Sequence, residues 1–301
     1  MIEVRGLRKR FGPVLAVDDL TFDVRPGTVT GFLGPNGAGK TTTMRMILGL
    51  DAPTGGTATV LGAPYGRIPA PMRAVGALLD AGAVHPRRTA RDHLLCLARS
   101  NALPRRRVEE VLGLAGLTAV AGRRAGTFSL GMSQRLGIAA ALLGDPGVLI
   151  FDEPVNGLDP EGIVWIRTLM RDLAAEGRTV LVSSHLMAEM ALTAGHLIVV
   201  GRGRLIADTA IDAFVRPGEV LVRTPDAAVL APALTAAGAR VRAGEGGLVV
   251  GGMATEEVGR LAAAEGAVLY ELTALRASLE EAFMELTRES VEYGVLDGAA
   301  R

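Results

Sequence analysis

The chain has 301 residues, 49% of them hydrophobic, and its 32 lysine and arginine residues balance its 32 aspartate and glutamate residues. This length and apolar content allow a sizeable buried core, so we expect a folded protein with one large and one small domain. The formal net charge of zero gives no support to a nucleic-acid partner bound through bulk positive charge.

The sequence also limits the expected cellular setting. Cys96 is the sole cysteine, which excludes an intrachain disulfide, and the first residues lack the charged-then-apolar pattern of a signal peptide. We therefore expect a reducing, cytoplasmic setting. No uninterrupted apolar stretch approaches the roughly 20 residues that a membrane-spanning helix needs, so we expect any membrane role to come through a partner polypeptide.

The first 30 residues or so predict an antiparallel β layer. Apolar and polar residues alternate on both sides of a turn at Phe11-Gly12-Pro13, and a second turn is predicted at Arg25-Pro26-Gly27.

Residues 34–41 form a complete GxxxxGK[ST] loop between a buried strand over 28–33 and a helix over 42–48. Its glycines let backbone N–H groups approach phosphates, Lys40 neutralises their charge, and Thr41 offers a hydroxyl to Mg²⁺. A glycine-rich turn with an incidental lysine is the alternative, but the flanking strand and helix oppose it. We expect nucleotide contacts from Gly34, Pro35, Asn36, Gly37, Ala38, Gly39, Lys40, Thr41 and Thr42.

Strand and helix patterns alternate after this loop. A helical period begins near residue 91, and we assign a helical insert to about 88–145. Buried strands are predicted over 147–151 and 179–183, with a helix over 160–176 between them. This alternation predicts a mainly parallel sheet with right-handed crossovers.

Two acids and a histidine follow these strands. Asp152 would hold Mg²⁺, and Glu153, one residue further, could polarise the attacking water. His185 follows the strand over 179–183, where open α/β sheets place ligands, and could hold Glu153 and the water in line. Without other motifs, Asp152-Glu153-Pro154 would more often be a polar strand end, and His185 would more often be a core or helix-start residue. The GxxxxGK[ST] loop over 34–41 favours the catalytic interpretation of both.

Beyond residue 216 short β-like runs alternate with alanine-rich helical ones, in the order strand, helix, hairpin, helix, strand, helix. This order predicts a small ferredoxin-like accessory domain over 217–289 and a tail over 290–301. The predicted elements cover 219–223, 227–237, 239–250, 255–264, 267–272 and 278–287.

The segment Phe128-Ser129-Leu130-Gly131-Met132 adds a resemblance to these motifs. It is similar to the LSGGQ signature of the ATP-binding subunit of ABC transporters, in a form that looks like the group exporting antibiotics, drugs and peptides. The resemblance covers about residues 1–216, and the C-terminal segment, which ends in residues 278–283, is similar to accessory tails of that group. It implies an α/β fold: a P-loop NTPase ABC cassette with a mainly parallel sheet, an antiparallel β layer and a helical insert, followed by a small C-terminal α+β domain.

The resemblance also implies roles for individual residues. Ser129 can cap the following helix and Gly131 lets a backbone N–H approach a phosphate; in this family that phosphate belongs to ATP on the opposite subunit. Phe11 occupies the place of an adenine-stacking aromatic, although it could instead be a core aromatic at a hairpin turn. Asp159 is implied to cross the dimer interface and couple the two sites.

One position departs from the family pattern. Asp80 stands where the family usually has a glutamine that touches both Mg²⁺ and the membrane partner. An aspartate keeps an oxygen ligand, but it adds a negative charge and is one methylene shorter. We expect Asp80 to sense the metal, directly or through water.

The sequence thus predicts an ATPase subunit of an ABC exporter. Two copies, or this chain and a related ATPase subunit, would close around two Mg-ATP molecules and drive a separate membrane permease, which holds the ATPase at the cytoplasmic face of the membrane. The transported drug, antibiotic or peptide would be chosen by the permease. Two alternatives stay open: a soluble ABC ATPase without a transport role, and a nucleotide-dependent regulatory module that hydrolyses nothing.

Overall fold

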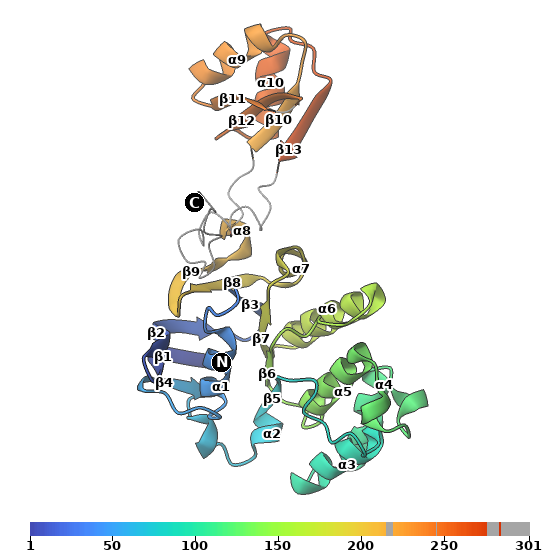
Figure 1. The fold of residues 1–301 in the computed structure, drawn as a ribbon. Helices are drawn as coiled ribbons and strands as arrows, with labels where there is room; N and C mark the ends of the chain where they lie inside the picture. Colours follow the sequence, from blue (N-terminus) through green and yellow to red (C-terminus); the bar gives the residue numbers. More distant parts are fainter. Residues whose placement is uncertain (215–218, 245, 276–282, 284–301) are drawn as a thin grey trace, which may run out of the picture. The chain divides into compact units, whose positions relative to one another are not determined.

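The computed structural model describes residues 1–214, 219–244, 246–275 and Phe283. The chain divides into two compact units, Met1–Ile211 and Asp212–Glu285 (Figure 1). The predicted boundary between residues 216 and 217 and the predicted tail over 290–301 lie outside the described residues. So does the predicted helix over 278–287, apart from Phe283.

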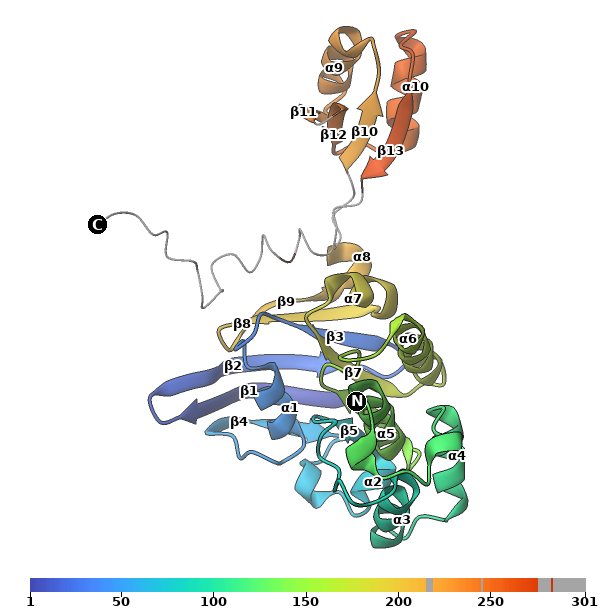
Figure 2. The same cartoon turned by 45° about the vertical axis from the view of Figure 1, so that its right-hand side comes forward.

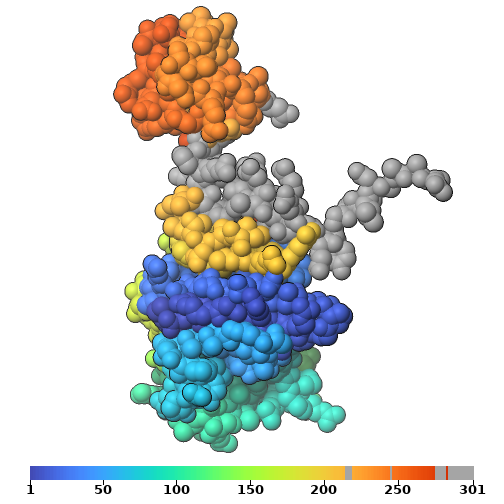
Figure 3. Space-filling view, turned by 90° about the vertical axis from the view of Figure 1, so that its left-hand side faces the viewer, coloured from blue at the N-terminus to red at the C-terminus, as the bar shows by residue number. Residues whose placement is uncertain are grey.

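The first unit begins with an antiparallel layer in the order β2-β1-β4. Its strands form a blue to light-blue band across one face of this unit (Figure 3). The predicted turn at Gly12-Pro13 is confirmed between β1 (Ile2–Phe11) and β2 (Val14–Val24). The third strand, β4 (Gly55–Val60), was not predicted, because the segment Gly-Gly-Thr-Ala-Thr carries little apolar signal.

A six-stranded sheet forms the centre of this unit, in the order β5-β6-β7-β3-β8-β9. The first five strands are parallel, and only β9 runs antiparallel to its neighbour. The predicted buried strands are confirmed as β3 (Val29–Leu33), β6 (Val148–Phe151) and β7 (Thr179–Ser184). The sheet also contains three strands that were not predicted, β5 (Val75–Leu78), β8 (His196–Gly201) and β9 (Arg204–Ala210).

Helices flank this sheet. The helix after the glycine-rich loop, α1 (Lys40–Ile47), begins two residues earlier than predicted. The helix predicted over 160–176 is found as α6 (Pro160–Ala175). Shorter helices are α2 (Pro71–Ala74), α7 (Met187–Thr193) and α8 (Ile211–Phe214).

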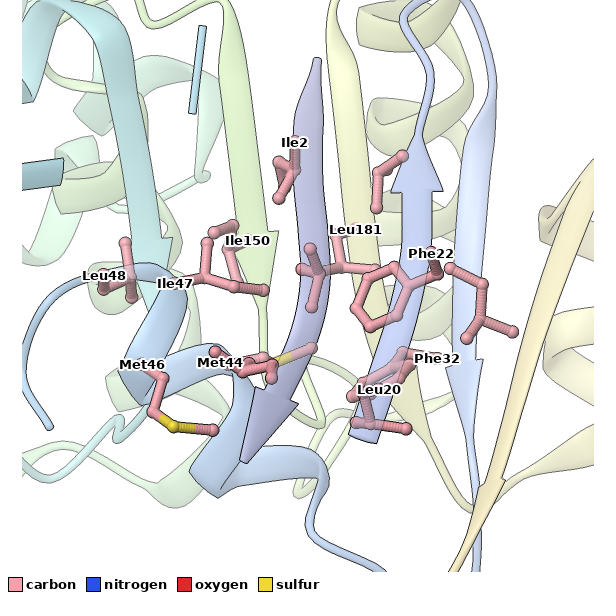
Figure 4. Packing of buried hydrophobic residues seen from close by; sticks show 14 of the residues in the cluster. Ile2, Leu20, Phe22, Phe32, Met44, Met46, Ile47, Leu48, Ile150 and Leu181 are labelled. Atoms are coloured by element: carbon pink, nitrogen blue, oxygen red, sulfur yellow. The ribbon is translucent and has the colours of Figure 1, made fainter. Parts of the chain in front are cut away.

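One hydrophobic cluster joins the β layer, α1 and the parallel sheet (Figure 4). The rings of Phe22 on β2 and Phe32 on β3 lie 5.5 Å apart between centroids. Met44 and Ile47 of α1 are buried in the same cluster as Leu181 on β7. Burial of such side chains stabilises the fold by roughly 1.5–3 kcal/mol each, so this core packs α1 against the β layer and the parallel sheet.

The helical insert gathers on one side of the sheet (Figure 2). Its main helices are α3 (Ala90–Ser100), α4 (Arg106–Leu114) and α5 (Leu130–Leu142). Helix α5 lies very close to β5: a Cβ atom added to Gly76 would stand 2.1 Å from the carbonyl oxygen of Ala141. Glycine at position 76 therefore sets the distance between the insert and the sheet.

The second unit contains β10 (Glu219–Arg223), α9 (Ala227–Ala236), β11 (Arg240–Gly244), β12 (Gly247–Gly251), α10 (Thr255–Ala264) and β13 (Glu271–Leu275). Its sheet has the order β11-β12-β10-β13, and all neighbouring strands are antiparallel. This βαββαβ connectivity is that of a ferredoxin-like unit. It has a core of its own, which includes Val222, Leu230, Leu234, Val250 and Val258.

The last strand of this unit was predicted four residues too early. The apolar segment over 267–270 suggested a strand over 267–272, but β13 begins at Glu271. The amide of Val268 donates to the carboxylate of Asp226 (2.9 Å) instead of joining a strand ladder. A side-chain hydrogen bond thus replaces the strand pairing that apolar periodicity had suggested.

We predict that Gly76→Ala weakens the first unit, because the added methyl collides with the backbone of α5. The free energy of unfolding should fall by about 1–3 kcal/mol. Denaturant unfolding followed by the fluorescence of Trp165, the chain's single tryptophan, measures this unit. Gly147→Ala is the matched control, since its Cβ would meet nothing within 4 Å, and it should change stability by less than about 0.5 kcal/mol. Equal effects of the two variants would contradict the prediction.

Candidate functional site

The glycine-rich loop forms one wall of a pocket at the carboxyl edge of the parallel sheet. A Cβ on Gly34 would stand 2.4 Å from the carbonyl oxygen of Val200, and Gly39 has a φ of 94°. Only glycine fits these two positions. The pocket, of about 240 Å³, is lined by Ala16, Asn36, Gly37, Ala38, Gly39, Lys40, Thr41, Thr42, Asp152 and Glu153.

The start of α1 faces this pocket without a side-chain cap. Gly39 is the N-cap residue, and the first turn contains no acidic residue. The free N–H groups and the positive end of the helix dipole therefore favour an anion at this end of α1.

Lys40 supplies a buried positive charge at the same place. It is only 8% exposed, and its ammonium donates to the carbonyl oxygens of Gly34 (2.6 Å) and Pro35 (3.2 Å). Desolvation lowers the pKa of Lys40 from its usual value, while the charges of Glu153 and Asp152 act in the opposite direction. These two carboxylates help to keep the buried lysine protonated.

Asp152 forms the opposite wall of the pocket, directly after β6. Its Oδ2 accepts a hydrogen bond from the hydroxyl of Thr41 (2.6 Å), and its Oδ1 accepts one from the hydroxyl of Ser183. Hydroxyl and carboxylate oxygens suit Mg²⁺, which usually takes few protein ligands and completes its shell with phosphate and water. Among the described residues no group of three or more His, Cys, Asp and Glu could hold a metal. The adjacent oxygens of Thr41 and Asp152 fit a magnesium ion that is shared with a phosphate.

Glu153 and His185 form a pair beside Asp152. The Nδ1 atom of His185 lies 2.7 Å from Oε2 of Glu153. The backbone of Glu153 has a φ of 49°, in the left-handed region that residues other than glycine seldom adopt. Its amide donates to the hydroxyl of Ser183 (2.9 Å), and its carbonyl accepts from the side-chain amide of Gln134 (3.1 Å).

Most residues of the predicted phosphate and acidic motifs come together here. The loop, Asp152 and Glu153 share one pocket, and His185 contacts Glu153. Sequence reasoning missed the contacts of Ser183 and Gln134. A signal existed for the second of these, because Gln134 is the chain's only glutamine and occurs in an otherwise largely apolar helix.

The signature segment lies elsewhere. The hydroxyl of Ser129 caps α5 by accepting from the amide of Met132 (3.2 Å), which confirms the predicted cap. A Cβ on Gly131 would stand 2.7 Å from the carbonyl oxygen of Gly157, so the start of α5 abuts the turn over 156–159. Asp159 caps α6 through the amide of Gly162 (2.9 Å). None of these residues lines the pocket of its own chain.

Phe11 and Asp80 also lie outside the lining of that pocket. Phe11 is 47% exposed at the β1–β2 turn, with the ammonium of Lys9 4.8 Å from its ring centre, which opposes the alternative of a core aromatic. The carboxylate of Asp80 accepts from the amide of Gly82 (2.7 Å) within its own loop. Adenine stacking by Phe11 and metal sensing by Asp80 both stay predictions.

Comparisons with known proteins agree with this geometry. Residues 17–156 match the family described as ABC transporter, and residues 218–280 match a domain of unknown function, DUF8746. The chain is 40% identical over 215 residues to the bacitracin transport ATP-binding protein BcrA of Bacillus licheniformis, an alignment that covers 70% of both proteins. It is 42% identical over 221 residues to the Nod factor export ATP-binding protein I of Paraburkholderia xenovorans, which covers 71% of this chain and 72% of that protein.

Solved structures show the same fold. The ATP binding subunit of an ABC transporter matches with a TM-score of 0.66 and 28% identity, over 71% of this chain and 91% of that one. A dimeric ATP-binding cassette in a post-hydrolysis state, bound to ADP and Pi, matches with a TM-score of 0.64 and 23% identity, over 70% of this chain and 99% of that one. Within the part of this chain that the structure describes, no helix is both long and apolar enough to cross a membrane.

We predict that Ser183→Ala destabilises the first unit, because the amide of Glu153 and one oxygen of Asp152 lose their partner. The free energy of unfolding, measured by Trp165 fluorescence, should fall by about 1–3 kcal/mol. Ser100→Ala serves as the control, since its hydroxyl donates to the carbonyl of Cys96 (2.8 Å) within the same helix, far from Glu153 in sequence. A loss no larger for Ser183→Ala than for the control would show that these contacts contribute nothing.

Proposed function

The chain belongs to the family of ABC transporter ATP-binding proteins, and we propose that two cassettes hydrolyse ATP between them to drive a separate membrane permease. The observation that carries this proposal is the Glu153–His185 pair beside the loop over 34–41 and the Thr41–Asp152 pair.

The proposed chemistry is phosphoryl transfer to water. The N–H groups at the start of α1 and the ammonium of Lys40 would bind the β- and γ-phosphates. Thr41 and Asp152 would hold Mg²⁺, which neutralises charge on those phosphates when it is bound. The carboxylate of Glu153 would accept a hydrogen bond from the attacking water and polarise it, and His185 would fix the direction of that carboxylate.

The second half of each ATP site is proposed to come from another copy, or from a related ATPase subunit. Ser129 and Gly131 stand at the N-terminus of α5, an end that attracts phosphate, yet they do not line the pocket of their own chain. Leu130 between them is 61% exposed, which leaves this end of the helix accessible. Asp159 lies in the adjoining turn and would contact the second subunit, so each site would sense the other.

The adenine end of the nucleotide is proposed to stack on Phe11. The exposed ring stands on the β1–β2 turn, and Ala16 of β2 lines the pocket formed by the glycine-rich loop, Asp152 and Glu153. Phenylalanine can stack on a base without contributing a hydroxyl group.

Export of a drug, antibiotic or peptide is the transport function that we propose. The names of the relatives support it, since one is a bacitracin transport protein and others are Nod factor export proteins. The permease would be a separate polypeptide that holds this ATPase at the cytoplasmic face of the membrane and selects the cargo.

Two other functions are tested by simple assays. A soluble ABC ATPase without a transport role would hydrolyse ATP but would not co-purify with a membrane protein. A regulatory module would bind ATP without multiple turnovers. The hydrogen-bond distance between Glu153 and His185 favours hydrolysis over the regulatory module.

We predict that Glu153→Gln traps an ATP-bound dimer, because the amide keeps the shape of the carboxylate but cannot act as a base. Light scattering should show an ATP-dependent shift from monomer to dimer in the presence of Mg²⁺. Turnover should fall by at least a factor of about 100.

The additional replacement of Lys40 or Ser129 by alanine should abolish this dimer. The Lys40 variant would lose phosphate binding, and the Ser129 variant would lose its contact with the ATP held by the other subunit. A protein that binds ATP yet stays monomeric in every variant would contradict closure by this chain alone. Co-expression with a candidate permease would then test whether closure requires the membrane partner.

A separate prediction concerns Asp80. If its carboxylate senses the metal, Asp80→Ala should lower ATP hydrolysis and raise the Mg²⁺ concentration needed for half-maximal activity. Asp80→Asn is the matched variant: it retains an oxygen that can accept from Gly82 and can ligate a metal, so its effect should be smaller. Unchanged activity and unchanged Mg²⁺ dependence in Asp80→Ala would exclude the proposed role.

A further inference from the structure

The backbone of Glu153 adopts an unfavourable conformation. Its φ of 49° places it in the left-handed region, where a side chain with a Cβ atom is strained. Such a conformation persists only where neighbouring groups fix it. The groups that fix Glu153 therefore help to decide where its carboxylate points.

Three hydrogen bonds fix this residue through its backbone. The amide donates to the hydroxyl of Ser183 (2.9 Å). The carbonyl accepts from the amide of Asn156 (3.2 Å) and from Nε2 of Gln134 (3.1 Å). Of these partners only Gln134 comes from the helical insert.

The burial of Gln134 and the chemistry of its amide group both favour this contact. Its side chain is 4% exposed, so the amide has been removed from water and needs a partner. The carbonyl of Glu153 can only accept, so the side-chain nitrogen, and not the side-chain oxygen, must face it. The direction of this hydrogen bond is thus fixed by chemistry.

We propose that Gln134 is a positioning residue for ATP hydrolysis: it holds the backbone of Glu153 so that the carboxylate meets His185 and the attacking water. This inference rests on the proposed function. Gln134 lies on α5, five residues after Ser129, which is a rise of about 7.5 Å along the helix.

The test compares three variants of the full chain in a steady-state ATPase assay. Gln134→Leu removes the donor but keeps a side chain of similar volume. The carbonyl of Glu153 keeps the amide of Asn156 as a partner, so the stability loss should be small. We expect kcat to fall about tenfold or more, with the KM for ATP changed less than about twofold, because a misplaced catalytic group affects turnover and not the phosphate contacts.

Gln134→Glu adds a second measurement, the pH dependence of kcat, which a purely structural role of Gln134 would not change. An ionised carboxylate at this buried position repels the carbonyl of Glu153, whereas its protonated form donates to it. Burial raises the pKa of such a carboxyl. The ratio of variant to wild-type kcat should therefore increase as the pH is lowered from 8.5 to 6.

Ser133→Ala is the control on the same helix, one residue away and without a contact to Glu153, and its kcat should match the wild type. A Gln134→Leu protein with wild-type kcat, or a Gln134→Glu ratio that does not change with pH, would overturn the proposal. The proposal would also be overturned if Gln134→Leu lowered kcat, raised the KM for ATP and strongly lowered the unfolding midpoint, because these changes together indicate a general structural role.

Failure of the proposed function is distinguishable from failure of this inference. If the wild-type chain binds ATP and shows no multiple turnover with or without a permease, the ATPase mechanism itself is wrong. If the wild type turns over and Glu153→Gln does not, only the Gln134 variants decide the positioning role.

Discussion

Lys40 is a buried cation, and the carboxyl edge of the parallel sheet is arranged to stabilise its charge. Removal from water disfavours the protonated ammonium, while two loop carbonyls and the carboxylates of Asp152 and Glu153 favour it. Those carboxylates reach Lys40 because β3 and β6, two strands of one parallel sheet, end at the same edge. The same geometry leaves N–H groups and positive charge on one side of the pocket and oxygen ligands on the other, which is what a magnesium-bound phosphate requires.

The close approach of the loop to its neighbours imposes a second constraint. Gly34 stands against the backbone of β8, and Gly39 against the backbone of β2. The glycine-rich loop therefore contacts both the parallel sheet and the antiparallel layer. The cluster around Phe22 and Phe32 fixes those two layers relative to each other, so the hydrophobic core sets the shape of a polar pocket.

Helix α5 connects the remaining parts of the candidate mechanism. Its N-terminus carries the capped Ser129, its middle reaches Glu153 through Gln134, and Ala141 near its end packs on β5 at Gly76. One helix thus carries Ser129, which is proposed to face a second subunit, and contacts Glu153, the proposed base. All the candidate site residues lie in the first unit, while the ferredoxin-like unit has a separate core.

The sequence by itself determined the elements with strong local signals and the nature of the chemistry. Alternation predicted β1 and β2, apolar runs predicted β3, β6 and β7, and the glycine-rich loop with Asp152 and Glu153 predicted phosphate binding. Short or weakly apolar strands such as β4 and β5 gave too little periodicity. Only the tertiary structure decided that Ser183 and Gln134 fix Glu153. These contacts depend on the register of β7 beside β6 and on the rotation of α5 about its axis, which are set by packing between segments distant in sequence.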